Sequence, residues 1–234
     1  MNPLMVALDV PTQREALDLV DRIDDAVDIY KVGLELYTRE GPGVVRALNG
    51  RGKRVFLDLK LHDIPNTVAR AVAAAGELEV DFLTIHAGGG ERMMEAAVEA
   101  AGERLRLLAV TVLTSLSAEE IGGTWGRPVH DVADEVVRLA RMAVAVGAPG
   151  VVGSALEART LRESLGPAPL IVTPGIRLPE DAAGDQVRIA TPESAIADGA
   201  THLVVGRPIR EAGDPRATAV RFGRAIRDAG GGAT

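Results

Sequence analysis

The sequence contains no cysteine. This absence excludes disulfide bonds, thiolate metal sites and a cysteine nucleophile, and it is typical of proteins that work in a reducing cytosol. Aromatic residues make up only 3% of the chain and the net charge is -7, so the basic surface and stacking platforms of a nucleic-acid-binding protein are missing. We therefore expect a cytoplasmic protein that does not bind nucleic acid.

Long hydrophobic runs are also missing. The apolar stretches are short and are broken by glycine or proline, whereas a membrane-spanning helix needs about 20 apolar residues. The first residues, MNPLMVALDV, have neither a basic start nor a cleavage site, so they predict a first strand and not a signal peptide. These patterns predict a soluble protein with no membrane segment.

Short apolar or β-branched segments recur along the whole chain. Continuous runs of this kind are typical of parallel strands that are buried on both faces. Between the runs lie helix-start signals, such as the capping-box pairs Thr12/Glu15, Ser117/Glu120 and Ser154/Glu157 and the pair Asp214–Pro215. The eight predicted strands cover residues 4–10, 27–33, 54–60, 82–88, 107–114, 150–154, 170–175 and 202–208.

Eight alternations of strand and helix predict a (β/α)8 TIM barrel of the α/β class. The length of 234 residues is close to the roughly 250 that such a barrel needs, which favours one domain. We expect the barrel to occupy residues 1–229 and residues 230–234 to form a frayed tail. A doubly wound open sheet is the alternative architecture.

Lysine is rare in this chain, which has 3 lysines among its 26 basic residues. Lys60 lies in the stretch DLKLHDIPNT (58–67), between Asp58 and Asp63. An amine can release a proton near neutral pH, whereas a guanidinium stays charged. Because flanking carboxylates stabilise an ammonium, we expect Lys60 to act as a proton donor and counter-charge. A structural ion pair at a strand end would place the same residues together.

Polar residues end nearly every predicted strand. In a barrel, chemistry takes place at the carboxyl ends of the strands. Strict alternation within FLDLKLH would direct Asp58, Lys60 and His62 to the barrel mouth and the intervening leucines to the helices. The polar residues at the strand ends are Asp9, Lys31, Asp58, Lys60, His86, Thr114, Ser154, Arg177 and Arg207.

The last two predicted strands end in LIVTPGIR and HLVVGRPI. Barrels often bind phosphate at these strands through loop amides and a helix N-terminus, and Arg177 and Arg207 would add bidentate donors. The sequence therefore predicts a phosphorylated ligand. The polar stretch 177–188 is long for a loop after a strand and predicts a lid in which Gln186 contacts the ligand, although its composition would also suit a plain loop.

Acidic residues and histidines do not cluster as metal ligands would, apart from Asp58 and Asp63. A lysine between these two carboxylates competes with a cation, so we expect no metal.

The stretch DLKLHDIPNT, with its D-x-K-x-x-D core, resembles the signature of the orotidine 5′-phosphate decarboxylase family. ALDV, HAGGG, VTVLTS, TPGIR and VVGRPI extend the similarity, in the same order, over essentially the whole chain. The resemblance implies a (β/α)8 barrel that converts orotidine 5′-phosphate to UMP and CO2 in pyrimidine synthesis, with neither a metal nor an organic cofactor.

The resemblance also implies a role for each matched residue. Lys60 would protonate C6 of the pyrimidine, and Asp58 would lie beside the departing carboxylate. Lys31 would belong to the same charged array and, with Asp9, would contact the ribose. The other matched substrate contacts are Thr114, Arg177, Gln186, Gly206 and Arg207.

A homodimer with shared active sites is implied as well, because Asp63 and Thr67 match residues that reach into the neighbouring subunit's site. Two alternatives remain. A Mg²⁺-dependent relative such as 3-keto-L-gulonate 6-phosphate decarboxylase shares D-x-K-x-x-D, but it carries an acidic ligand where this chain has Lys31. A non-catalytic nucleotide-binding barrel would be expected to have lost Asp58, Lys60 or Asp63.

Overall fold

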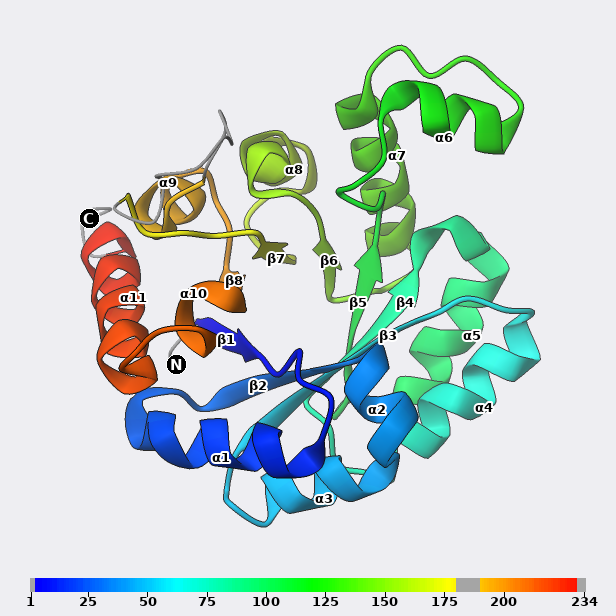
Figure 1. Ribbon diagram of the computed structural model, residues 1–234. Coiled ribbons are helices and arrows are strands. Elements are labelled where there is room, and N and C mark those ends of the chain that lie inside the picture. Colours follow the sequence, from blue (N-terminus) through cyan, green and yellow to red (C-terminus); the bar gives the residue numbers. More distant parts are fainter. Residues whose placement is uncertain (1–2, 180–189, 231–234) are drawn as a thin grey trace.

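Eight parallel strands close into a barrel in the computed structural model, which describes residues 3–179 and 190–230 (Figure 1). Each strand pairs with the next one along the chain, and the last pairs with the first. The predicted (β/α)8 barrel is confirmed, and the open doubly wound sheet is wrong. The strands are β1 (Leu4–Ala7), β2 (Ile29–Gly33), β3 (Arg54–Leu61), β4 (Phe82–His86), β5 (Arg106–Val110), β6 (Gly150–Val152), β7 (Leu170–Pro174) and β8 (His202–Val205).

Helices surround the strands on the outside (Figure 1). They are α1 (Gln13–Ile23), α2 (Leu34–Glu40), α3 (Pro42–Asn49), α4 (Pro65–Gly76), α5 (Glu91–Ala101), α6 (Ala118–Trp125), α7 (Val132–Ala145), α8 (Ala158–Leu165), α9 (Pro192–Ala197), α10 (Arg207–Arg210) and α11 (Pro215–Gly230). Three short 3-10 helices, η1 (Asp24–Ala26), η2 (Ala87–Gly89) and η3 (Ala155–Glu157), complete the chain as described. No helix of residues 3–179 and 190–230 is long and apolar enough to span a membrane.

Helix starts follow the predicted capping signals closely. Ser117 and Ser154 form reciprocal capping boxes with the glutamates three residues later. Thr12 accepts a hydrogen bond from the Glu15 amide, but the Glu15 side chain binds the Thr12 hydroxyl and not its amide, so only half of that predicted box forms. Asp214 caps α11, with its carboxylate 2.9 Å from the Ala217 amide. The predicted tail, apart from Gly230 at the end of α11, lies outside the described residues.

Several strands end earlier than their apolar runs suggest. β1 ends at Ala7, β5 at Val110 and β8 at Val205, and the remaining residues of each predicted run lie in the loop that follows or, for Arg207 and Pro208, in α10. A run of apolar residues does not mark where the ladder of hydrogen bonds stops. The polar residues Asp9, Thr114 and Arg207 therefore lie beyond the strands and not within them.

Alternate residues of the strands face two separate hydrophobic layers. The outer layer lies between barrel and helices and contains, for example, Val6, Leu57 and Leu83. The inner layer fills the barrel, which is therefore a packed core and not a pore. Its buried members are Met5, Ala7, Ile29, Phe56, Phe82, Leu108, Val172 and Val204.

The amino end of the barrel holds a buried histidine. His202 opens β8, and its ring meets the edge of Phe82, with 5.6 Å between ring centroids. The guanidinium groups of Arg106 and Arg54 lie 4.6 and 5.7 Å from the centre of the same Phe82 ring, and Arg54 pairs with Asp81 at 2.7 Å. Burial, followed by the charges of the two arginines, lowers the pKa of His202 to about 4.

We predict that His202 makes the free energy of unfolding fall as the pH is lowered from about 6.5 to about 4. The pKa of His202 is lower in the folded state than in the unfolded state, so the unfolded state takes up the proton first. The contribution is complete above pH 6.5 and is lost through this window, by about 3 kcal/mol at most.

Urea unfolding at a series of pH values tests this prediction. The variant His202→Asn should show a weaker pH dependence than the wild type, whereas His130→Asn, at an exposed position, should match the wild type. Equal pH dependence in the two variants would contradict it.

Candidate active site

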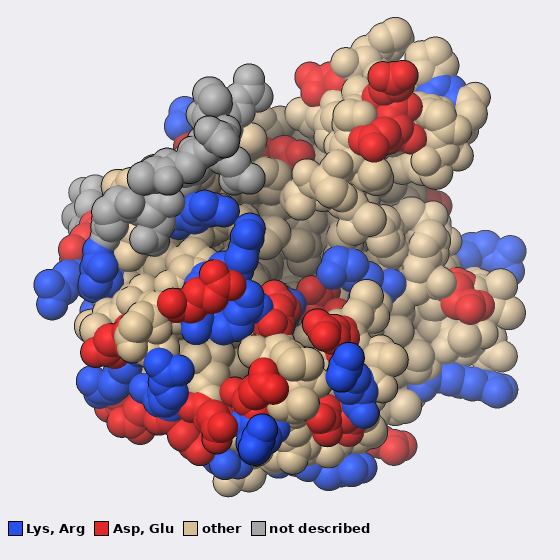
Figure 2. Space-filling view, viewed as in Figure 1, with Lys and Arg blue, Asp and Glu red and all other residues tan. Residues whose placement is uncertain are grey.

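A cavity of about 440 Å³ opens at the carboxyl ends of the strands. On the surface it is a hollow bordered by basic and acidic side chains (Figure 2). Loops from both halves of the chain contribute to it, so the fold brings together residues that are distant in sequence. The predicted site residues that line the cavity are Asp9, Lys31, Asp58, Lys60, Thr114, Arg177, Gly206 and Arg207.

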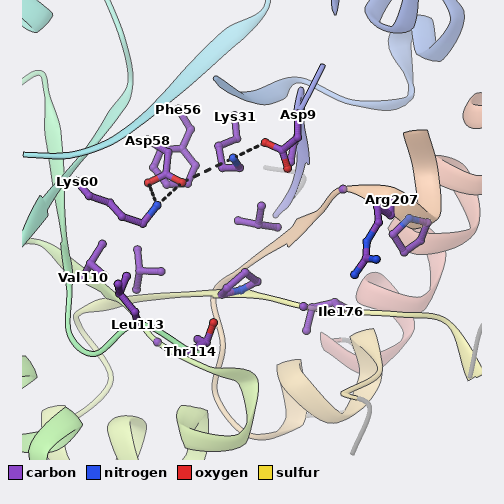
Figure 3. A pocket seen from close by; sticks show the side chains of 18 of the residues that line it. Asp9, Lys31, Phe56, Asp58, Lys60, Val110, Leu113, Thr114, Ile176 and Arg207 are labelled. Atoms are coloured by element: carbon purple, nitrogen blue, oxygen red, sulfur yellow. Dashed lines mark hydrogen bonds and ion pairs between the residues drawn. The ribbon is translucent and has the colours of Figure 1, made fainter. Parts of the chain in front are cut away.

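Four charged side chains form a continuous array on one wall of the cavity (Figure 3). Both carboxylate oxygens of Asp58 accept hydrogen bonds of 2.9 Å from Nζ of Lys60. The ammonium of Lys31 lies 3.6 Å from Asp58 and 3.0 Å from Asp9. Asp58 is only 9% exposed, so its charge is compensated mainly by the two ammonium groups and not by water.

A glycine at the end of β2 makes room for this array. A Cβ atom at Gly33 would lie 3.1 Å from Nζ of Lys31 and 3.3 Å from Oδ1 of Asp9. Both distances are tighter than ordinary contacts, so a side chain here would push the ion pair apart.

The end of β3 departs from regular strand geometry. Leu57 pairs with Leu83 of β4, and the next paired residue, Leu61, lies opposite Ile85. An advance of four residues along β3 therefore matches an advance of only two residues along β4, which is a shift of register. Lys60 sits within this bulge and has a φ of 49°, in the left-handed region that side chains other than glycine rarely adopt.

Despite the bulge, the predicted alternation holds as far as Leu61. Asp58 and Lys60 line the cavity, and Leu57, Leu59 and Leu61 pack against the outer layer, as expected. The prediction is wrong at His62, which follows the end of β3. His62 does not line the cavity. Its ring stacks on that of His86, with 5.2 Å between centroids and an angle of 20°.

His86 ends β4 and was expected to face the site, yet it lies beside the cavity and does not line it. Its Nδ1 accepts a hydrogen bond of 3.3 Å from the amide of Gly88 and so caps η2. Burial, and then the electrostatic effects of the neighbouring His62 and Lys60, lower the pKa of His86. A neutral imidazole at this place suits a structural role in the loop after β4.

The loops after β7 and β8 form the opposite side of the cavity. Gly175 and Arg177 follow β7, while Gly206 is the N-cap residue of α10, which Arg207 begins. The side chain of Arg207 lies across the cavity from Lys60 and Asp58 (Figure 3). One end of the cavity therefore presents guanidinium groups and the other presents alternating acids and ammonium groups.

Apolar residues form much of the remaining wall, and sequence reasoning did not identify them. They carry no charge or motif that marks them. Val110, Val152 and Pro174 are the last residues of β5, β6 and β7, whereas the predicted strands continue to residues 114, 154 and 175. With accurate strand ends, alternation alone could have found these three. The apolar residues that line the cavity and were not predicted are Ala7, Phe56, Val110, Val112, Leu113, Val152, Pro174, Ile176, Val204 and Pro208.

Asp63 and Thr67 do not line the cavity of their own chain. Both are exposed, and the Asp63 carboxylate accepts a hydrogen bond of 2.6 Å from the next amide, that of Ile64. Gln186 lies outside the described residues, as does most of the predicted lid. Among the residues described, no group of three or more histidine, aspartate or glutamate side chains is arranged to hold a metal ion.

The sequence and the fold both match known proteins. The family model described as Orotidine 5′-phosphate decarboxylase / HUMPS family matches residues 2–222. Relatives named orotidine 5′-phosphate decarboxylase from Anaeromyxobacter sp. (strain K) and Chromohalobacter salexigens are each 49% identical, over 92% and 96% of this chain and 94% and 96% of theirs.

A solved structure agrees with this match. The crystal structure of orotidine 5′-phosphate decarboxylase from Lactobacillus acidophilus superposes with a TM-score of 0.87 at 38% identity, over 97% of this chain and 99% of that one. The resemblance carried by DLKLHDIPNT is confirmed, and the chain belongs to the orotidine 5′-phosphate decarboxylase / HUMPS family.

Proposed function

We propose that this protein decarboxylates orotidine 5′-phosphate to UMP and CO2, as a cytoplasmic enzyme of pyrimidine synthesis. The observation that carries the proposal is the arrangement of the cavity. Asp58 and Lys60 are in direct contact on one wall, and Arg207 lies across from them. A nucleotide monophosphate has the matching polarity, with its reacting ring at one end and a dianion at the other.

The reaction is difficult because loss of CO2 leaves an electron pair in the plane of the pyrimidine, where the π system cannot absorb it. Enzymes lower barriers by about 8 to 23 kcal/mol, and this reaction needs the upper part of that range. One hydrogen-bond donor to a developing charge supplies only about 2.7 to 4 kcal/mol. Lys60 alone is therefore insufficient, and the charged array and the binding of remote groups must supply the rest.

In the proposed mechanism, the substrate carboxylate lies beside Asp58. The bond from C6 to the carboxylate breaks, CO2 leaves, and the electron pair stays on C6. An N–H bond of the Lys60 ammonium then breaks as C6 takes the proton, which leaves a neutral amine next to Asp58. Lys31 compensates part of the negative charge on Asp58 and, with Asp9, holds the ribose.

The other predicted contacts bind parts of the substrate that do not react. Arg177, Gln186, Gly206 and Arg207 are proposed to bind the phosphate, and Thr114 another polar group of the nucleotide. Binding energy from the phosphate can be expressed at the transition state if it closes the lid and orders the site. The apolar wall that includes Val110 and Val152 would exclude water from the departing CO2.

We also propose a homodimer in which Asp63 and Thr67 complete the partner's site. Their exposure, and their absence from the cavity of their own chain, supports this role. Two large apolar side chains lie exposed just after the neighbouring strands β2 and β3. Leu34, the first residue of α2, is 54% exposed, and Ile64, the N-cap residue of α4, is 67% exposed. Burial of such side chains between two copies would stabilise a dimer.

The magnesium-dependent alternative is less well supported. Where those relatives carry an acidic ligand, this chain has Lys31, whose ammonium already compensates Asp9 and Asp58.

We predict that the purified protein removes the orotate absorbance of added orotidine 5′-phosphate and releases CO2 and UMP in equal amounts, at a rate that EDTA does not change. Absence of turnover would contradict the proposed activity. Turnover that EDTA abolishes would favour the magnesium-dependent chemistry.

A pair of variants separates the two ends of the cavity. Lys60→Ala should lower kcat by at least about 10²- to 10³-fold, because it removes the proton donor, while UMP still binds with an affinity within a few-fold of the wild type. Arg207→Ala should weaken UMP binding by about 10- to 100-fold, the effect of losing hydrogen bonds to a charged group. Stopped-flow kinetics and calorimetric titration of UMP measure these effects. Near-normal turnover by Lys60→Ala would rule out the assigned proton donor.

Mixing two impaired variants tests the shared site. In a dimer of one Asp63→Ala chain and one Lys60→Ala chain, one of the two sites has both residues intact. Random reassociation after mixing should therefore restore about a quarter of wild-type turnover, although each variant alone is nearly inactive. Activity that never exceeds the sum of the separate variants would show that Asp63 does not act across a dimer.

A further inference from the structure

Thr84 is a buried polar residue among the mainly apolar side chains that fill the barrel. It lies in the middle of β4 and is completely buried. Its neighbours Leu83 and Ile85 belong to the outer hydrophobic layer, so Thr84 points the other way, into the barrel. It does not line the cavity, and no motif in the sequence marks it.

The hydroxyl group of Thr84 makes two hydrogen bonds, both to the charged array. It accepts a hydrogen bond of 2.8 Å from the backbone amide of Lys60 and donates one of 2.9 Å to Oδ1 of Asp58. A hydroxyl is a group that can accept and donate through one atom. Valine, which has nearly the same shape, could do neither.

The bond to the Lys60 amide lies at an unusual point of the backbone. Lys60 has a φ of 49°, and the regular ladder between β3 and β4 is interrupted from Leu57 to Leu61. Backbone in this region is costly for a side chain other than glycine, and it persists only where the surroundings hold it in place. The hydroxyl of Thr84 takes the place of a strand partner for this amide.

The bond to Asp58 fixes the orientation of the carboxylate. Nζ of Lys60 lies 2.9 Å from both Asp58 oxygens, a symmetrical arrangement that depends on how the carboxylate plane is turned. Thr84, which does not line the cavity, donates to Oδ1 and so restricts the rotation of this carboxylate. One buried hydroxyl thus holds both partners of this ion pair, Lys60 through its backbone amide and Asp58 through its carboxylate.

We propose that Thr84 is a positioning residue for the decarboxylation reaction, which sets the place of the Lys60 ammonium and the Asp58 carboxylate without touching the substrate. This inference rests on the proposed function. A small displacement of a reacting group can cost about 100-fold in rate, whereas the phosphate end of the cavity is built by other strands. Loss of the hydroxyl should therefore lower kcat and leave UMP binding nearly unchanged.

The chain offers a matched control for the experiment. Thr173 in β7 is also completely buried, and its hydroxyl has no hydrogen-bond partner among the residues that the structure describes. Replacement by valine at this position removes a buried threonine hydroxyl from a barrel strand but breaks no such hydrogen bond. Thr173→Val should keep wild-type kcat.

Steady-state kinetics with orotidine 5′-phosphate and calorimetric titration of UMP test the proposal on Thr84→Val, Thr84→Ser and Thr173→Val. We expect kcat of Thr84→Val to fall by roughly 10- to 100-fold, with the Kd of UMP within about threefold of the wild type. Thr84→Ser retains the hydroxyl and should recover most of the rate. Should the valine variant not fold, Thr84→Ala replaces it with the same expectation.

Two outcomes would overturn the inference. In the first, Thr84→Val turns over as fast as Thr173→Val. In the second, kcat and UMP affinity fall together and serine does not restore them, which is what general damage to the fold would produce. Failure of the wild type to consume orotidine 5′-phosphate would contradict the proposed function instead. A crystal structure of Thr84→Val, in which Lys60 should leave the left-handed region, would then test the hydrogen bonds by themselves.

Discussion

The carboxylate of Asp58, buried between two ammonium groups, is the interaction on which the rest of the site depends. A buried charge is tolerable only when it is paired and hydrogen-bonded, and Lys60, Lys31 and Thr84 together meet that need. In the proposed reaction, a second carboxylate brought beside Asp58 would disturb this balance, and loss of CO2 would restore it. The lysine that pairs with Asp58 is held in a left-handed backbone conformation within the bulge of β3.

Much of the fold could be predicted from the sequence. Eight buried strands produce eight apolar runs, and helix caps between them produce local signals such as Ser117 with Glu120. The scarcity of lysine in the chain indicated Lys60 and Lys31 as candidate site residues, and both line the cavity. What the runs could not indicate was the end of each hydrogen-bond ladder, since apolar residues such as Val112 continue into the loops.

The candidate site was only partly predictable, for physical reasons that differ between residues. β3 ends at Leu61, so His62 lies in the loop that follows, where alternation no longer applies, and its ring stacks on that of His86 and does not line the cavity. Thr84 acts through hydrogen bonds that exist only after β3 and β4 pair, and a lone threonine in an apolar run gives no sign of them. Asp63 is the opposite case to Thr84. The sequence motif identified it, but in the described chain its side chain is exposed and does not line the cavity of its own chain.

A crystal structure with bound UMP tests the central claim most directly, because it shows where the pyrimidine lies relative to the Lys60 ammonium. If the account is right, Nζ of Lys60 approaches C6 within the roughly 3 to 3.5 Å of reacting atoms, and the phosphate lies against Arg207. A pyrimidine ring bound away from Nζ, with Lys60 still paired only to Asp58, would contradict it.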